Sequence, residues 1–134
     1  MSAFDPQYFK KTKFSKEQIL GYLANGFRDL EIAEKDHASE VRFTFAYQAL
    51  VKAGIACLAR EGYKLRAAPG HHVRLIEKFS EFLKNADVLT FGNAMRMKRN
   101  EDLYGDGGFV SEKEAEEYLV FVRSVLNKAK ARLK

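Results

Sequence analysis

The sequence has little of several residue types, and each scarcity excludes a class of protein. It contains one cysteine, two prolines and no tryptophan in 134 residues. A single cysteine, Cys57, cannot form an internal disulfide or a multi-thiolate metal site, so the chain fits a reducing compartment and we expect it to be cytoplasmic. No apolar run approaches the roughly 20 residues that span a bilayer, and no signal-peptide core follows the N-terminal lysines. We therefore expect no membrane partner.

The residues that are abundant indicate one globular domain. Hydrophobic residues make up 46% of the chain and charged residues 31%, a balance typical of folded rather than disordered proteins. The length suits a single domain over residues 1–134, large enough to fold without a disulfide or a metal. The net charge of +5 is compatible with an anionic partner but does not establish one.

Apolar side chains recur at helical spacing along most of the sequence. Ser15 with Gln18, and Ser111 with Glu114, have the spacing of a capping box, so each pair predicts a helix start. The Gly-rich segment 105–108 is predicted to be an exposed turn. The predicted helices cover residues 15 onward, 39–61, 71–84, 87 or 88 to 103, and 111 onward.

The loops between these helices are short, which favours antiparallel neighbours. The predicted fold is therefore all-α, an up-and-down antiparallel bundle of about five helices. The helix over 39–61 is apolar around more than one face, which predicts a central position. Residues 1–14 are predicted to be an irregular lead-in, and residues 63–70 a loop. Since no segment alternates with period two, we expect no sheet.

The segment most suggestive of function lies near the end of the fourth predicted helix. It carries three cations, Arg96, Lys98 and Arg99, followed by Asn100, two acids and Tyr104. A solvated helix end, in which the cations pair with Glu101 and Asp102, explains these residues without any function. Charge clusters of this kind are common at helix ends, so these residues alone favour that interpretation. The alternative is a phosphate-binding surface, because the planar guanidinium group matches phosphate oxygens.

Several short motifs in order favour the second interpretation. Arg99-Asn100-x-x-x-Tyr104-Gly-Asp comes before a capped final helix that begins at Ser111. Ala46-Tyr47-Gln48-Ala49-Leu50 lies on the central helix, and Gly70-His71-His72 opens the next one. In this order and spacing, over residues 17–133, the chain resembles the HEPN domain family.

The resemblance implies a helical bundle that forms a homodimer. Many HEPN domains accompany a small nucleotidyltransferase, often as toxin and antitoxin, and many cut RNA without a metal. Their active motif is an arginine, usually followed by a polar residue, with a histidine a few positions later. Carried over, the arginine is Arg99 and the polar residue is Asn100. No histidine follows here; Asp102, Leu103 and Tyr104 stand where it would be.

This departure matters for the chemistry. Cleavage of RNA through the 2′-hydroxyl needs a proton acceptor, a proton donor and a cation for the charge that builds on the phosphate. Arg99 can supply the cation, but tyrosine, with a reference pKa of about 10, is a poor base at neutral pH. The resemblance makes Arg99, Asn100 and Tyr104 the candidate catalytic residues. The candidate binding residues are Arg96, Lys98 and Asp102.

Other chemistry-bearing residues are interpreted more plainly. His71 and His72 open a helix, where they can either hold an anion or simply cap and pack. His37 is expected at the surface, and Cys57 is expected to be a buried small hydrophobe. No group of residues has metal-ligand spacing, so we expect no metal and no cofactor.

Three hypotheses about function remain open. The first is a HEPN-like bundle that binds RNA or nucleotide phosphate, as a degenerate nuclease or toxin-like component. The second is a non-enzymatic interaction module that partners a small nucleotidyltransferase. The third is an active metal-independent endoribonuclease in which Tyr104 or a distant histidine replaces the missing one.

Overall fold

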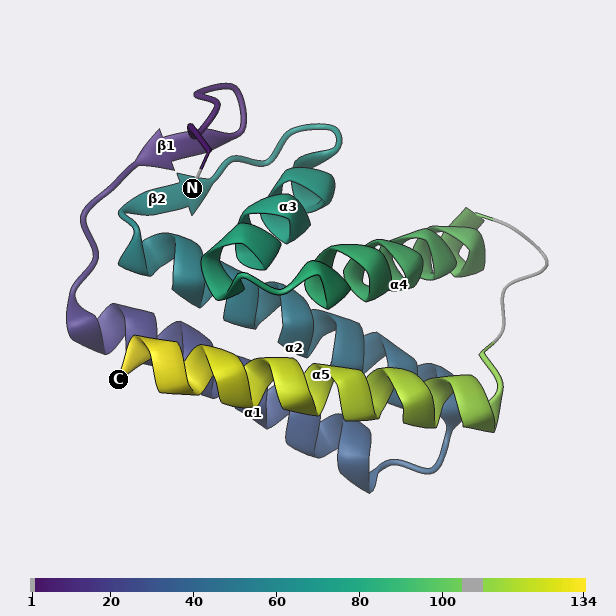
Figure 1. Ribbon diagram of the computed structural model, residues 1–134. Coiled ribbons are helices and arrows are strands. Elements are labelled where there is room, and N and C mark those ends of the chain that lie inside the picture. The colour runs from purple at the N-terminus through teal and green to yellow at the C-terminus, as the bar shows by residue number, and fades with distance from the viewer. Residues whose placement is uncertain (1, 105–109) are drawn as a thin grey trace.

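The structure is a computed structural model that describes the backbone of residues 2–104 and 110–134, and the side chains of residues 2–100 and 110–134. Over this part of the chain it confirms the all-α class, with five helices and one small sheet (Figure 1). The elements in chain order are β1 (Phe9–Lys11), α1 (Lys16–Lys35), α2 (Ser39–Arg60), β2 (Tyr63–Leu65), α3 (His71–Leu83), α4 (Ala86–Tyr104) and α5 (Glu112–Leu133).

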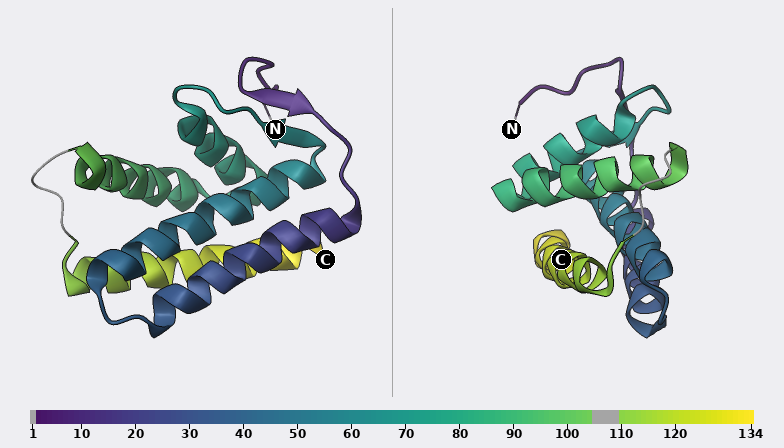
Figure 2. Two further views of the ribbon diagram at one scale, coloured as in Figure 1. Left: turned by 180° about the vertical axis from the view of Figure 1, so that it is seen from behind. Right: turned by 90° about the vertical axis from the view of Figure 1, so that its right-hand side faces the viewer.

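Helix α2 occupies the centre of the bundle, as its apolar pattern predicts. It contacts each of the other four helices. Figure 2 shows α3 and α4 together on one side of α2, with α1 and α5 on the other. The interior of α2 is rich in buried small residues, which let neighbouring helices approach closely. Gly26 of α1 has the same role, because a Cβ placed there would lie 3.2 Å from the backbone oxygen of Ala49.

Both predicted capping boxes are present. The hydroxyl of Ser15 accepts a hydrogen bond from the backbone N–H of Gln18, and the Gln18 side chain accepts one from the Ser15 backbone. Ser111 and Glu114 make the same reciprocal pair at the start of α5. Each box satisfies two backbone donors that the first helical turn leaves free. These local interactions explain why both helix starts could be predicted from the sequence.

The expectation of no sheet is wrong. Strands β1 and β2 pair antiparallel, with Phe9 opposite Leu65 and Lys10 opposite Lys64. The predicted irregular lead-in and the predicted loop over 63–70 therefore each contain a strand. Each strand has only three residues, too few to show a convincing alternation in sequence. The pairing joins segments more than fifty residues apart, so only the tertiary fold brings them together.

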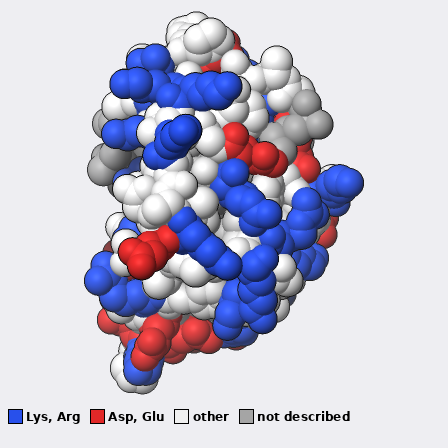
Figure 3. All heavy atoms as spheres, turned by 90° about the vertical axis from the view of Figure 1, so that its left-hand side faces the viewer, with Lys and Arg blue, Asp and Glu red and all other residues white. Residues whose placement is uncertain are grey.

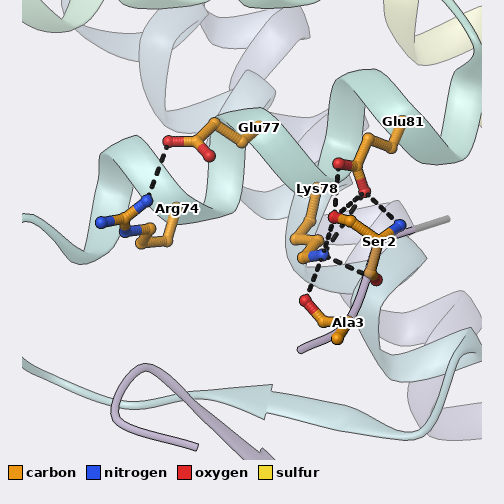
Figure 4. A network of polar contacts seen from close by, with 6 residues as sticks. All are labelled: Ser2, Ala3, Arg74, Glu77, Lys78 and Glu81. Atoms are coloured by element: carbon orange, nitrogen blue, oxygen red, sulfur yellow. Dashed lines mark hydrogen bonds and ion pairs between the residues drawn. The ribbon is translucent and has the colours of Figure 1, made fainter. Parts of the chain in front are cut away.

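The lead-in before β1 is anchored to α3 by a buried lysine. Lys78 is 6% exposed, and its ammonium donates to the backbone oxygens of Ser2 and Ala3 at 2.9 and 2.7 Å (Figure 4). It also lies 4.6 Å from the centre of the Phe4 ring. Phe4 in turn stacks on Tyr63 of β2, with ring centres 3.9 Å apart. Residues 2–4 are thus held in place by polar and aromatic contacts together.

Helix α4 is the least embedded of the five described helices. Val88 and Met95 face the core, whereas Leu89 is 39% and Met97 55% exposed. Its second half extends past the start of α3 (Figure 1). Residues of these two segments line a surface hollow. In the described residues no helix is long and apolar enough to cross a membrane.

Candidate functional site

The start of α3 and the second half of α4 enclose a hollow of about 390 Å³. We call it the α3–α4 hollow. In this hollow Arg96, Arg99 and Asn100 of α4 lie together with His71 and His72 of α3. The histidines come more than twenty residues earlier in the sequence. The lining of the hollow consists of Gly70, His71, His72, Val73, Arg96, Arg99 and Asn100.

The backbone at the start of α3 leaves the hollow open. Gly70 is the N-cap residue, with φ at 77°, a left-handed conformation that favours glycine. A Cβ added at Gly70 would meet nothing within 4 Å, so the approach is unobstructed. No side chain caps this helix, unlike α1 and α5. The backbone N–H groups of His71 and Val73 already donate to the backbone oxygens of Ala68 and Gly70. Among the described first-turn amides, that of His72 is left for an anion, which the helix dipole also favours.

Tyr47 of α2 lies behind the lining of the hollow, against His72. Its side chain is 1% exposed, and its hydroxyl lies 2.9 Å from Nδ1 of His72. Burial raises the pKa of Tyr47 to about 12, against the opposing effect of Arg99 and Arg96, so the phenol keeps its proton at neutral pH. The Tyr47 hydroxyl donates this proton in a hydrogen bond to Nδ1 of His72, which gives the buried hydroxyl a partner. Because Nδ1 accepts, the proton of the neutral His72 ring is on Nε2.

His72 is held in the neutral form. Burial lowers its pKa to about 4, and the electrostatic effects of neighbouring His71, Arg99 and Arg96 act in the same direction. At neutral pH its ring can therefore donate one N–H without carrying a charge. A bound anion would offset the repulsion from the arginines, so anion binding and protonation of His72 should favour each other.

His71 lies against His72, with ring centres 4.4 Å apart. Its Nδ1 is 2.7 Å from the backbone oxygen of Ala68. A carbonyl oxygen only accepts hydrogen bonds, so Nδ1 must carry a proton. This leaves Nε2 as the ring nitrogen that can accept a proton from a ligand when the ring is neutral.

The two arginines of the hollow lie on successive turns of α4. The guanidinium carbon of Arg99 is 5.6 Å from the centre of the Tyr47 ring, a cation–π geometry that orients the group. Arg96 donates from Nε to the Asn93 side chain at 3.3 Å. Both side chains are partly exposed. Among the carboxylates whose side chains the structure describes, none lies within ion-pair distance of either arginine.

The sequence-predicted site residues separate into three groups. Arg96, Arg99 and Asn100 line the hollow as a group. Lys98 lies on the same helix but points to α5, where its Nζ is 3.4 Å from a Glu114 oxygen. Asp102 and Tyr104 belong to the last turn of α4, and their side chains lie outside the described residues, as does the predicted turn over 105–108.

Sequence reasoning missed one member of the site and undervalued another two. Tyr47 was noticed only as part of a family-like motif, and nothing in its helical spacing indicates a histidine partner on another helix. For His71 and His72 the sequence allows an anion-holding role, but it favours the explanation that they cap and pack at the helix start. What decides between the explanations is the position of α4, which brings Arg96 and Arg99 to the same hollow.

The remaining chemistry-bearing residues behave as expected or stay apart from the site. Cys57 is 1% exposed, and burial raises the pKa of its thiol to about 12, so it is not a nucleophile at neutral pH. His37 is exposed at the α1–α2 turn. Within the part of the chain that the structure describes, no three His, Cys, Asp or Glu residues gather in a way that would hold a metal.

Comparison with family models, with curated proteins and with solved structures gave no match to this chain. The geometry of the hollow is therefore the basis for inferring a function. That geometry provides two guanidinium groups, an amide, two imidazoles and an uncapped helix start around one open space. Such a set is suited to holding an anion with several oxygen atoms.

Proposed function

We propose that the protein binds the phosphate of RNA or of nucleotides in the α3–α4 hollow, as a HEPN-like helical bundle. The observation that carries this proposal is the convergence of Arg96 and Arg99 with His71 and His72 around one open space. Each guanidinium group can donate two parallel hydrogen bonds to phosphate oxygens, and the start of α3 adds the backbone N–H of His72. Neutral His72 adds a further N–H donor without increasing the repulsion between the cations.

The burial of Tyr47 supports the same proposal. A protonated phenol behind the lining of the hollow holds the ring of His72, and its aromatic face holds Arg99. A site whose side chains are oriented before the ligand arrives loses less conformational entropy on binding. The partly exposed guanidinium of Arg99 can reach a ligand from this position.

The test is binding of a fluorescently labelled AMP and of a labelled RNA to the purified protein. Arg99→Ala is expected to weaken both by about tenfold to a hundredfold, the equivalent of about 1.5–3 kcal/mol for a charge-assisted hydrogen bond. Lys98→Ala is the matched control, because it removes the same charge from the adjacent residue outside the hollow. If Arg99→Ala and Lys98→Ala bind alike, phosphate is not held in the hollow.

A second candidate function is metal-independent cleavage of the bound RNA. The observation that favours it is the position of the two imidazoles in the same hollow as Arg99, because HEPN-like cleavage requires a histidine and none follows Arg99 in the sequence. In this proposal Nε2 of His71 accepts the proton of the attacking 2′-hydroxyl, and Arg99 stabilises the charge that develops on the phosphate. The 2′-oxygen bonds to phosphorus as the bond to the 5′-oxygen breaks, and the leaving 5′-oxygen takes a proton from solvent.

Incubation of RNA with the protein in excess chelator tests this candidate. Cleavage is expected to persist without a metal and to be lost in His71→Ala, with products that carry a 2′,3′-cyclic phosphate. His37→Ala is the control, since that imidazole is exposed at a distant turn. Intact RNA after prolonged incubation with the wild-type protein would leave binding as the only function of the hollow.

The proposal includes protein partners. We propose a homodimer, which is supported by exposed apolar residues on α4 and α5: Phe91 is 43%, Met97 55% and Val120 50% exposed. Light scattering during gel filtration should give twice the chain mass, and Met97→Asp should reduce it to the monomer. A monomeric wild-type protein that co-purifies with a small nucleotidyltransferase would favour the interaction-module alternative.

A further inference from the structure

A second concentration of positive charge lies at the other end of the bundle from the α3–α4 hollow. Figure 3 shows lysine and arginine side chains gathered over the face that carries β1, β2 and the start of α1. We call this surface the basic end. Its members are exposed, and within the described side chains none is in an ion pair. They are Lys10, Lys11, Lys13, Lys16, Arg60 and Lys64.

The sheet places two of these lysines against each other. Lys10 of β1 is directly opposite Lys64 of β2, so their side chains leave the same face of the sheet as neighbours. Like charges in this position oppose folding, and the structure gives neither lysine a described carboxylate partner. A polyanion lying across the sheet would remove this repulsion.

The basic end is presented by a fixed segment. Phe9 is 3% exposed and buries one side of β1, which directs Lys10 to solvent. The anchoring of Ser2 and Ala3 by Lys78 holds the residues before β1 (Figure 4). Lys16 and Arg60, from α1 and α2, line a further hollow of about 290 Å³ beside this sheet. The cations are therefore placed on at least three elements that pack together.

Aromatic side chains lie next to these cations. An apolar hollow of about 190 Å³ is lined by Phe14, Tyr22 and Tyr63, and Lys64 forms part of its wall. Proteins that bind single strands combine a positive surface along the backbone with aromatic rings on which bases stack. An anionic membrane or a duplex would use the charges but would have no use for a small aromatic hollow. The arrangement therefore favours a single strand.

We infer that the basic end binds the backbone of a single-stranded polynucleotide whose other part occupies the α3–α4 hollow. This inference depends on the proposed function and names its ligand as a strand rather than a mononucleotide. Arg60 follows Tyr47 by thirteen residues on the same helix, which is roughly 20 Å along its axis. At about 3.4 Å per nucleotide, a stacked strand of roughly six nucleotides spans that distance.

Fluorescence anisotropy with oligouridylates of 3 and 12 nucleotides, at several salt concentrations, tests the inference. The double variant K10Q/K64Q is expected to weaken binding of the 12-mer and to make its salt dependence shallower by about 1.4 in log–log slope, since each lost contact to a single strand contributes about 0.7. The 3-mer and labelled AMP should bind as they do to the wild type. Tyr22→Leu is expected to weaken the 12-mer without any change in slope, because stacking involves no phosphate.

The control variant K35Q/K113Q removes the same charge from exposed lysines away from the basic end. Equal losses of 12-mer binding in the two double variants, or no loss in either, would overturn the inference and leave the proposed function standing. Binding of phosphatidylserine vesicles through Lys10 and Lys64, with a 12-mer no tighter than a 3-mer, would also overturn it. The proposed function fails separately, if AMP binding does not respond to Arg99→Ala.

Discussion

The α3–α4 hollow and the basic end both collect positive charge, but they do so with different chemistry. The hollow uses two arginines, one of them held over a buried tyrosine ring, with two histidines and a helix start around them. The basic end uses mainly lysines on an open face. Guanidinium groups recognise phosphate geometry, whereas ammonium groups act as hydrated point charges. One region is thus suited to placing a phosphate, and the other to attracting a chain of them.

The basic end depends on the anchoring of the segment before β1, whereas the α3–α4 hollow does not. The substitution Lys78→Met is expected to show this difference with the largest effect. Loss of the hydrogen bonds to Ser2 and Ala3 should lower the free energy of unfolding by about 3 kcal/mol, because a buried charged donor is replaced and its acceptors are left without a partner. Denaturant unfolding measures this loss. AMP binding in the hollow should be unchanged while strand binding at the basic end weakens.

Glu77→Gln is the matched control for Lys78→Met. It removes an exposed ion pair with Arg74 on the same helix, where the two atoms are 3.4 Å apart, and should leave both stability and binding unchanged. Equal destabilisation by the two substitutions would mean that the lead-in is not anchored through Lys78.

Exchanging arginine and lysine tests whether the hollow needs a guanidinium group while the basic end needs only a positive charge. Arg99→Lys should weaken AMP binding by about tenfold, because the ammonium cannot make two parallel bonds to phosphate or stack on Tyr47 in the same way. Lys64→Arg at the basic end should bind the 12-mer as tightly as the wild type. Equilibrium titrations of both variants check this, and equal tolerance at the two positions would remove the chemical distinction between the regions.

Of the two regions, only the α3–α4 hollow is expected to make the free energy of unfolding depend on pH in mild acid. The folded pKa of His72 is lowered to about 4, against a reference value of about 6.5, so the unfolded chain binds the proton first. The free energy of unfolding should therefore fall as the pH drops from about 6.5 to about 4, by roughly 1 kcal/mol once solvent screening of this partly exposed ring is allowed for. His72→Gln should flatten that part of the profile.

A bound phosphate should shift the same titration. Because an anion offsets the repulsion from Arg96 and Arg99, AMP should raise the pKa of His72, which NMR titration of the ring protons measures. The basic end contains no histidine, so a strand held there alone would leave this pKa unchanged. An identical pKa with and without AMP would place the ligand outside the hollow.

The smallest expected effect concerns the facing lysines of the sheet. Lys10→Gln should raise the free energy of unfolding by about 0.2–1 kcal/mol, because it removes the repulsion from Lys64. Lys11→Gln is the control, since Lys11 is opposite Tyr63 and has no facing charge. Thermal or urea unfolding of both variants decides the point. A loss of stability in Lys10→Gln would mean that this lysine contributes to folding after all.

The helices could be predicted because their causes are local. Ser15 with Gln18 and Ser111 with Glu114 form capping boxes within one turn, and the apolar spacing around them continues to the end of each helix. The central position of α2 followed from its wide apolar surface. The three-residue strands could not be predicted, because their pairing joins segments more than fifty residues apart, on either side of α1 and α2.

Only part of the candidate site could be predicted from the sequence. Arg96, Arg99 and Asn100 share one stretch of chain, so their grouping could be predicted from helical spacing. Lys98 appeared equivalent to them, yet the position of α5 gives it Glu114 as a partner instead. Tyr47 and His72 are twenty-five residues apart, and their hydrogen bond exists only because α3 packs on α2.

The sequence by itself determined the helical class, the helix starts and the arginines available on α4, since these depend on propensity and spacing within a few turns. Only the tertiary structure decided which cations share a hollow with the histidines and which are left without a described partner on an open face. The physical reason is distance: charge, hydrogen bonding and burial act between side chains a few ångströms apart, and packing alone brings distant parts of the chain that close.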